Sequence, residues 1–202
     1  MIMAAIAGGG AWIYYSHSQP GPSNILGYGV AEETARLLGN KGQVMIIAPD
    51  TTELEYPSVK DALNLFQKTL NKKGMTVATT VKFKLTPIER MATGGVVPRD
   101  QFLNALQSHA NPGAIILFCG FPQLAKEDYD ILKQSGAKVV VASGYIPRYT
   151  NLLKAQVIDL AIVPQFDGSA ASSKKPRTPL ERFESEFVVI TSSNAGNVPE
   201  RQ

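Results

Sequence analysis

The stretch "GAIILFCGFPQLAKEDYDILKQSGAKVVVASG", residues 113–144, decides the fold of this chain. It begins with an apolar run at 113–120, continues into an amphipathic segment at 123–136 and ends in a second apolar run at 137–144. Continuous apolar runs of this length are typical of strands buried on both faces, which occur in parallel sheets whose crossover connections are helices. The stretch therefore predicts a strand, a helix and a second, parallel strand.

The same alternation continues in both directions along the chain. Further buried strands are predicted at 42–49 and 157–164, and amphipathic helices at 28–40, 56–74, 99–110 and 148–156. Apolar strands separated by amphipathic helices indicate a sheet covered by helices on both faces. We therefore predict the α/β class, as a three-layer α/β/α sandwich with a mostly parallel, flavodoxin-like sheet of five or six strands, preceded by an N-terminal membrane helix.

Three segments depart from this regular pattern. The run "MTVATTVKFKL" at 75–85 alternates apolar and polar residues, which favours a strand with one wetter face at an edge of the sheet. Residues 86–98 and 165–179 are rich in Gly, Pro, Ser or Thr and are predicted to be loops, the first of them long and irregular. The run "FESEFVVITSSN" at 183–194 is expected to be a last strand, which pairs at an edge.

The first fifteen residues carry no charged side chain and end in aromatic residues. A helix over 1–16 rises roughly 24 Å, slightly less than the roughly 30 Å of a hydrocarbon core. Trp and Tyr favour the membrane boundary, and small residues four apart let membrane helices pack closely. We expect a membrane-anchoring helix that contacts lipid and other membrane helices; the residues of interest are Ala4, Gly8, Ala11, Trp12, Tyr14 and Tyr15. A cleaved signal peptide and a buried soluble helix are the alternatives.

Four segments follow from this interpretation: the anchor at 1–16, a linker at 17–24, one α/β domain at 25–194 and a tail at 195–202. A chain of 202 residues is long enough for one domain of ordinary size. No Lys or Arg precedes Arg36, so the positive-inside rule places the folded domain on the extracytoplasmic side, which is the bacterial periplasm.

Composition narrows the class of function. The formal net charge of +3 arises from scattered residues, which gives no strong footprint for nucleic acid. The one basic cluster, Lys174–Arg182, is interpreted as a solvated loop. Cys119 is the single cysteine, so no disulfide within the chain and no cysteine metal cluster can form.

The order of these elements resembles one lobe of the type 1 periplasmic sugar-binding proteins, the fold shared with repressors of the lactose-repressor kind. The best-matching motifs are "FQKTLNKKGMTV" at 66–77 and "VITSSN" at 189–194, and the resemblance spans residues 25–194. It implies a sugar held between two lobes by aromatic and charged residues at the carboxyl ends of strands. The chain has length for one lobe, and "DTTELEYP" at 50–57 replaces the acidic and arginine residues that the family presents there.

A small-molecule site, if the domain has one, is expected beyond the carboxyl ends of the strands, where open parallel sheets bind ligands. The candidate ligand-binding residues are Asp50, Thr51, Thr52, Cys119, Ser143, Tyr145, Gln165 and Asp167. The alternative is that these are ordinary polar residues at loop ends.

No catalytic constellation, metal site or cofactor site is predicted. Cys119 with His109 as base would be a thiol enzyme, but the topology separates the two by roughly 25 Å across the sheet. A flavin phosphate loop is disfavoured because Glu53 and Glu55 follow Thr51 and Thr52. No P-loop, GxGxxG or GxSxG motif occurs.

The sequence therefore favours a non-catalytic, membrane-anchored extracytoplasmic protein that serves as an accessory subunit or interaction module of a membrane complex. The alternative is a small-molecule binding protein of the periplasmic type 1 class, for a sugar or nucleoside, which completes its cleft by forming a homo-oligomer.

Overall fold

The computed structural model describes residues 22–50, 57–109, 111–142, 149–165 and 176–196. The elements in chain order are α2 (Pro22–Leu37), β1 (Gln43–Pro49), α3 (Pro57–Lys72), β2 (Thr76–Phe83), α4 (Pro87–Thr93), α5 (Arg99–Ser108), β3 (Ala114–Leu117), α6 (Lys126–Gln134), β4 (Lys138–Ala142), α7 (Tyr149–Lys154), β5 (Leu160–Pro164), α8 (Pro179–Glu186) and β6 (Phe187–Thr191).

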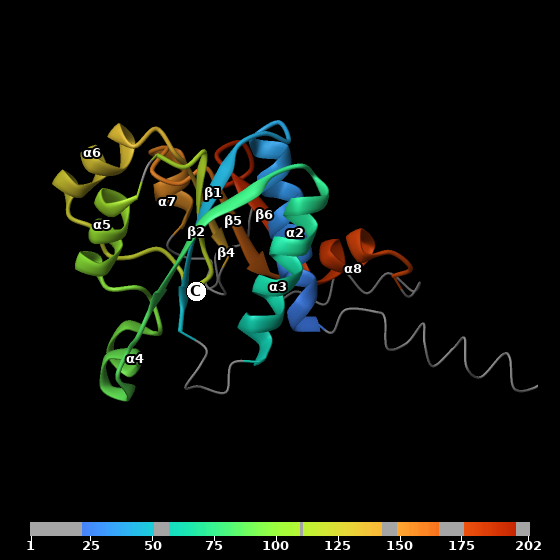
Figure 1. The fold of residues 1–202 in the computed structure, drawn as a ribbon, viewed down its shortest axis with the longest axis horizontal. Coiled ribbons are helices and arrows are strands. Elements are labelled where there is room, and N and C mark those ends of the chain that lie inside the picture. The colour runs from blue at the N-terminus through green and yellow to red at the C-terminus, as the bar shows by residue number, and fades with distance from the viewer. Residues whose placement is uncertain (1–21, 51–56, 110, 143–148, 166–175, 197–202) are drawn as a thin grey trace, which may run out of the picture.

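One six-stranded sheet organises the domain, in the order β2-β1-β3-β4-β5-β6 (Figure 1). The first five strands are parallel and β6 runs antiparallel beside β5. This confirms the predicted mostly parallel, flavodoxin-like sheet, with β2 at one edge and the last strand at the other. The predicted helix that would precede it, at 1–16, lies outside the described residues.

Side chains that alternate along each strand fill two cores, one on each face of the sheet. Ile47, Leu117 and Val141 are adjacent in register and belong to the core beneath α5, α6 and α7. Ile46 and Ile116 point to the opposite face, where α2, α3 and α8 pack. Because both faces are covered, these strands are fully buried, and this is why they appear as continuous apolar runs in the sequence.

The helix α2 packs closely on α3 and on α8, and a glycine stands at each contact. A Cβ at Gly27 would lie 1.9 Å from the carbonyl oxygen of Ala62, so only glycine lets the two backbones approach this closely. A Cβ at Gly29 would lie 2.0 Å from the ring of Phe183 on α8. The helix begins at Pro22, inside the segment expected to be a linker and six residues before the helical pattern at 28–40.

The expected loop at 86–98 contains a short helix, α4, so this prediction is wrong for 87–93. The Oγ1 of Thr86 accepts the Glu89 N–H at 3.2 Å, and the Glu89 carboxylate accepts the Thr86 N–H at 2.8 Å. This reciprocal capping box, with Pro87 in the first turn, begins the helix. Gly94 ends it in a left-handed conformation.

The start of the last predicted strand is also a helix. Residues 179–186 form α8, and β6 covers only 187–191 of the expected 183–194. A second capping box, between Thr178 and Glu181, begins this helix. The helical turn directs Phe183 into the core, where the ring is 2% exposed.

No helix among the described residues is both long and apolar enough to cross a membrane. The membrane-facing candidates Ala4, Gly8, Ala11, Trp12, Tyr14 and Tyr15 lie outside the described residues.

Candidate functional site

The carboxyl ends of the parallel strands meet at one edge of the sheet, which we call the carboxyl edge. The helix α3, which follows β1, packs on one face of the sheet, and α5 and α6, on either side of β3, pack on the other. The chain therefore changes face between β1 and β3, and ligands in open α/β sheets bind outside such a switch point. The register pairs Ile47 with Leu117, so Asp50 and Gly120 each lie three residues beyond that pair.

Asp50 is the one charged candidate that the structure describes. Its backbone N–H donates to the Phe83 carbonyl at 2.8 Å, which fixes the residue beside the end of β2. Its side chain is 15% exposed, and Oδ2 lies 3.7 Å from the Nζ of Lys84, a residue that the sequence did not single out. A partly buried carboxylate beside a cation is a strong hydrogen-bond acceptor.

Cys119 lies at the same edge but is buried. Its thiol faces the carbonyl oxygens of Ile47 at 3.8 Å and Gly120 at 3.6 Å. Burial raises the pKa of the Cys119 thiol to about 12, and a hydrogen bond with the Val97 backbone acts in the opposite direction. A thiol that stays protonated at neutral pH is not an activated nucleophile. Cys119 therefore acts as a small apolar residue packed in the core.

His109 is at the other end of α5 from this edge. Its Nδ1 lies 2.9 Å from the carbonyl oxygen of Ala105 on the same helix. The helix α5 follows β2 and leads back to the start of β3, so His109 lies near the amino ends of the strands, whereas Cys119 lies past the carboxyl end of β3. The two side chains do not form a catalytic pair.

The segment after β3 is held in place by aromatic contacts on both faces of the sheet. Phe118 meets Phe66 edge to face, with ring centroids 5.6 Å apart. Phe121 meets Phe102 in the same way at 6.1 Å, and it is half-buried. Gly120 between them has a φ of +79°, a conformation that side chains disfavour. This turn gives the carboxyl edge a rigid, partly apolar centre.

Gln165 follows β5, and its backbone N–H donates to the Glu186 carbonyl at 2.8 Å. This bond joins the end of β5 to the end of α8. Its side chain is half-buried, so Gln165 keeps some exposed surface at the edge.

The remaining candidates cannot be placed. Asp50, Cys119 and Gln165 are brought to one edge of the sheet, as predicted. The other five lie outside the described residues: Thr51, Thr52, Ser143, Tyr145 and Asp167.

An ion pair that the sequence did not predict joins two helices on one face, with Asp128 buried and Arg99 about half exposed. Arg99, the first residue of α5, donates from Nε and Nη2 to the two carboxylate oxygens of Asp128 on α6, both at 2.6 Å. The Ala125 N–H adds a third bond at 2.8 Å. The bonds from Arg99 lower the pKa of the 2% exposed Asp128 carboxyl. Two residues that are 29 apart in sequence give no local signal, which is why periodicity could not find this pair.

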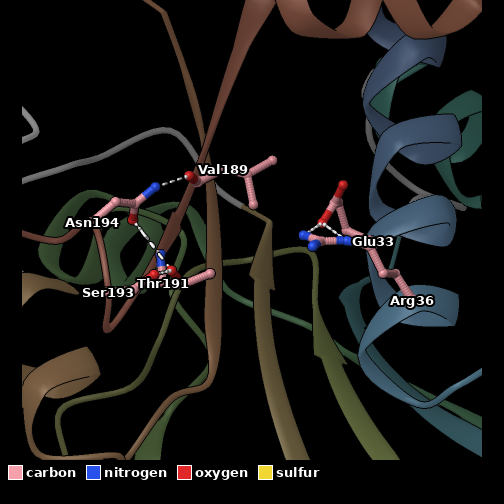
Figure 2. A network of polar contacts seen from close by, with 6 residues as sticks. All are labelled: Glu33, Arg36, Val189, Thr191, Ser193 and Asn194. Carbon is pink, nitrogen blue, oxygen red and sulfur yellow. Dashed lines mark hydrogen bonds and ion pairs between the residues drawn. The ribbon is translucent and has the colours of Figure 1, made fainter.

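The motif "VITSSN" has a structural role at the opposite, amino edge of the sheet. Asn194 donates to the Val189 carbonyl at 3.0 Å and accepts the Thr191 N–H at 2.7 Å (Figure 2). The Thr191 and Ser193 hydroxyls are 2.7 Å apart. Figure 2 also shows the pair of Glu33 and Arg36 on α2. Because β6 is antiparallel, its carboxyl end lies at the amino edge of the sheet, far from Asp50. Asn194 closes a turn at that end of β6.

Within the described part of the chain, no group of three or more His, Cys, Asp or Glu side chains is arranged to hold a metal ion.

Comparison with protein families and with curated proteins finds no match. Solved structures do match. They include AraP, an arabinose-binding protein of Geobacillus stearothermophilus (13% identity, TM-score 0.54, 87% of this chain and 62% of that one). A solute-binding protein of an ABC transporter from Burkholderia graminis, in complex with D-arabinose, also matches (17%, TM-score 0.56, 88% and 62%). A third comes from Bacillus halodurans, with bound myo-inositol (18%, TM-score 0.56, 86% and 60%).

These matches correct one prediction and support another. The expectation that the domain is a non-binding accessory subunit or interaction module is wrong, because the structures that share its fold are sugar- and solute-binding proteins. The chain spans about three fifths of the length of those proteins. The described domain has the fold of one lobe of the type 1 periplasmic sugar-binding proteins, as the sequence pattern indicated.

Proposed function

We propose that this domain is a non-catalytic binding lobe that takes a sugar, or a similarly hydroxylated small molecule such as a nucleoside, at its carboxyl edge. The observation that carries the proposal is the position of Asp50: a partly buried carboxylate at the switch point of a fold shared with sugar-binding proteins.

The chemistry of this edge suits a polyhydroxylated ligand. The Asp50 carboxylate can accept hydrogen bonds from hydroxyl groups, and the Lys84 ammonium can donate to a ligand oxygen. The half-buried Phe121 supplies apolar surface for the C–H groups of a sugar ring. Few polar groups on a mostly apolar surface are typical of small-molecule sites.

The folded domain is proposed to be extracytoplasmic, with residues 1–16 as its membrane anchor. The support is the fold shared with periplasmic-type solute-binding proteins and the uncharged N-terminal run. Deleting residues 1–16 should move the chain from the carbonate-washed membrane fraction to the soluble fraction. A chain that is soluble with these residues present would contradict the anchor.

Isothermal titration calorimetry of the chain with D-arabinose and myo-inositol tests the binding function. We expect saturable binding of at least one of them, with affinity reduced by Asp50→Ala and by Tyr145→Ala. Asp130→Ala, which removes an exposed carboxylate from α6, is the matched control and should leave binding unchanged. Flat titrations against a wide sugar and nucleoside panel would reject the proposal, and so would equal loss of affinity in Asp50→Ala and Asp130→Ala.

A further inference from the structure

The connection from β3 to α6, residues 118–125, passes beside Asp50 at the carboxyl edge. The sheet fixes its first residue, since the Phe118 N–H donates to the Ile47 carbonyl at 3.0 Å. Beyond that bond, residues 119–124 make no backbone-to-backbone hydrogen bond with another residue of the described part of the chain. The position of this connection at the candidate ligand site therefore depends on contacts made by side chains.

One short segment, residues 97–102, meets the start and the middle of the connection. The buried Val97 makes a backbone hydrogen bond with the Cys119 thiol. The fully buried Phe102 meets Phe121 edge to face, with ring centroids 6.1 Å apart. A thiol is a weak hydrogen-bonding group, and the burial of apolar rings has little directional preference. These two contacts hold the connection against α5 without fixing its orientation.

The end of the connection is held by a directional contact. Arg99 donates to both carboxylate oxygens of Asp128 at 2.6 Å, a two-point arrangement that fixes angle as well as distance. Asp128 also accepts the Ala125 N–H at 2.8 Å. The buried carboxylate thus joins the last residue of the connection to the first residue of α5, and Figure 1 shows α5 and α6 side by side.

Arg99 itself is engaged with the protein. Its Nη1 donates to Oδ1 of Asp100 at 3.1 Å, in addition to the two bonds to Asp128. With three bonds to two carboxylates of its own chain, Arg99 is placed to act on a ligand through the connection and not by direct contact.

We propose that Arg99 is a positioning residue for the candidate ligand site. Through the Asp128 carboxylate it fixes the turn at 120–121, which carries the half-buried Phe121 beside Asp50. A site that is ordered before the ligand arrives loses less conformational freedom on binding. This inference rests on the proposed sugar-binding function, and it names a residue that sets the affinity without touching the ligand.

The amino edge contains a contact of the same kind, which supplies a matched control. The Lys138 Nζ lies 2.8 Å from the Asp159 carboxylate, and that carboxylate also accepts the Val139 N–H. Each arrangement joins a cation, a carboxylate and a backbone N–H, and the Arg99 and Lys138 side chains are both about half exposed. The two differ in the edge of the sheet at which they lie.

Calorimetry of the full chain in a mild detergent measures the effect on affinity. The probes are D-arabinose and myo-inositol. We expect Arg99→Ala to weaken the binding of either sugar about tenfold, because the turn must then be ordered on binding. Lys138→Ala should leave the affinity unchanged. Asp100→Ala, which removes the other acidic partner of Arg99, should also leave it unchanged.

Backbone amide relaxation of the ligand-free chain measures the order of the turn directly. In Arg99→Ala the order parameters of Gly120, Phe121 and Leu124 should fall from about 0.85, typical of rigid backbone, toward about 0.6. Those of β3 should stay high. Lys138→Ala should leave both sets unchanged.

Arg99→Lys separates positioning from stability, and it carries both measurements if Arg99→Ala does not fold. Lysine keeps a positive charge beside Asp128 but cannot make the two-point contact. We therefore expect the midpoint of thermal unfolding to stay near that of the unaltered chain, while the affinity falls and the turn loses order.

Equal affinities in Arg99→Ala and the unaltered chain would overturn the inference. So would a loss of order spread evenly over β3 and the connection, which would make the pair a support of the whole fold. Loss of order confined to the turn, with flat sugar titrations of the unaltered chain, would uphold the positioning of the turn and reject the binding function. Sugar binding with unchanged affinity and an ordered turn in Arg99→Ala would do the reverse.

Discussion

The two edges of the sheet differ in how their connections are built. At the amino edge the connections are short: 38–42, 73–75, 109–113, 135–137 and 155–159. At the carboxyl edge they are longer, at 50–56, 84–98, 118–125, 143–148 and 165–178, the second of which includes α4. Long connections on a rigid sheet are where binding residues concentrate. The comparison indicates that the amino edge maintains the fold and that the carboxyl edge is available for function.

Polar groups at the two edges are also used differently. At the amino edge the Asp159 carboxylate accepts the Val139 N–H and contacts the Lys138 Nζ, both at 2.8 Å. Asn194 closes its turn in the same self-contained way. At the carboxyl edge the Asp50 carboxylate lies 3.7 Å from the Lys84 Nζ and is 15% exposed. Polar groups that bond the backbone of the sheet serve its stability, whereas a partly exposed carboxylate at a switch point can contact a ligand.

The largest expected effect on stability comes from Asp128→Ala, which removes the tie between the starts of α5 and α6. The two 2.6 Å bonds from Arg99 and the bond from the Ala125 N–H are lost together. Losing three hydrogen bonds to a buried carboxylate together leaves the Ala125 N–H without its acceptor, which makes this the largest of the expected losses. The midpoint of thermal unfolding, followed by circular dichroism, should fall by several degrees. The exposed Asp130→Ala on the same helix should change it little; similar losses in both variants would contradict this role for the pair.

The next largest effect is expected at the amino edge. Asp159→Ala leaves the Val139 N–H without its acceptor, which costs about 1–2 kcal/mol in the free energy of unfolding. Urea denaturation measures this loss. Because the residue lies away from the carboxyl edge, the affinity for sugar should not change. If Asp159→Ala were as stable as the unaltered chain but bound sugar more weakly, the roles that we assign to the two edges would be contradicted.

A smaller effect is expected from acid. The folded-state pKa of Asp128 is lowered, chiefly by the hydrogen bonds from Arg99. Its contribution to stability is therefore present above the unfolded-state pKa of about 3.9 and is lost as the pH falls through the lower folded-state value. Between about pH 3.9 and the folded-state pKa, urea midpoints should decline less steeply with falling pH in Asp128→Asn than in the unaltered chain. Identical slopes would show that Asp128 does not contribute to acid sensitivity.

The smallest effect on stability is expected from Asp50→Ala. An ion pair at 3.7 Å with a 62% exposed lysine contributes about 0–1 kcal/mol. Because we assign Asp50 to the ligand site, urea denaturation should place this variant close to the unaltered chain, although its affinity for sugar falls. A loss of stability as large as that of Asp159→Ala would mean that Asp50 maintains the fold, and the distinction between the edges would fail there.

The parts of the fold that follow from periodicity were predictable. The structure confirms the strands predicted from apolar runs, such as β1 and β3, and the helices predicted from amphipathic patterns, such as α3 and α5. It also confirms that β2 lies at an edge of the sheet. The helix α4 was missed because Gly, Pro and Thr around it suggested a loop, and α8 was missed because residues 183–186 were assigned to the last strand. Their shared signal was the Thr-Pro-x-Glu capping box, which local inspection could have detected.

The site was harder to predict than the fold. The carboxyl edge follows from topology, so Asp50, Cys119 and Gln165 could be placed there together. Lys84 and the pair of Arg99 and Asp128 depend on contacts between distant segments, which leave no pattern in a single sequence. Cys119, a candidate ligand-binding residue, is instead buried in the core. Its burial depends on the packing of Val97 and other residues of that core.

Backbone amide chemical shifts measured during titration with D-arabinose or myo-inositol test the central claim most directly, because they report both edges in one experiment. The account predicts saturable shifts at Asp50, Lys84, Gly120 and Gln165. It predicts no shifts at the amino-edge residues Gly113, Val139, Asp159 and Asn194. Shifts concentrated at the amino edge, or spread equally over both edges, would contradict the assignment of the ligand site.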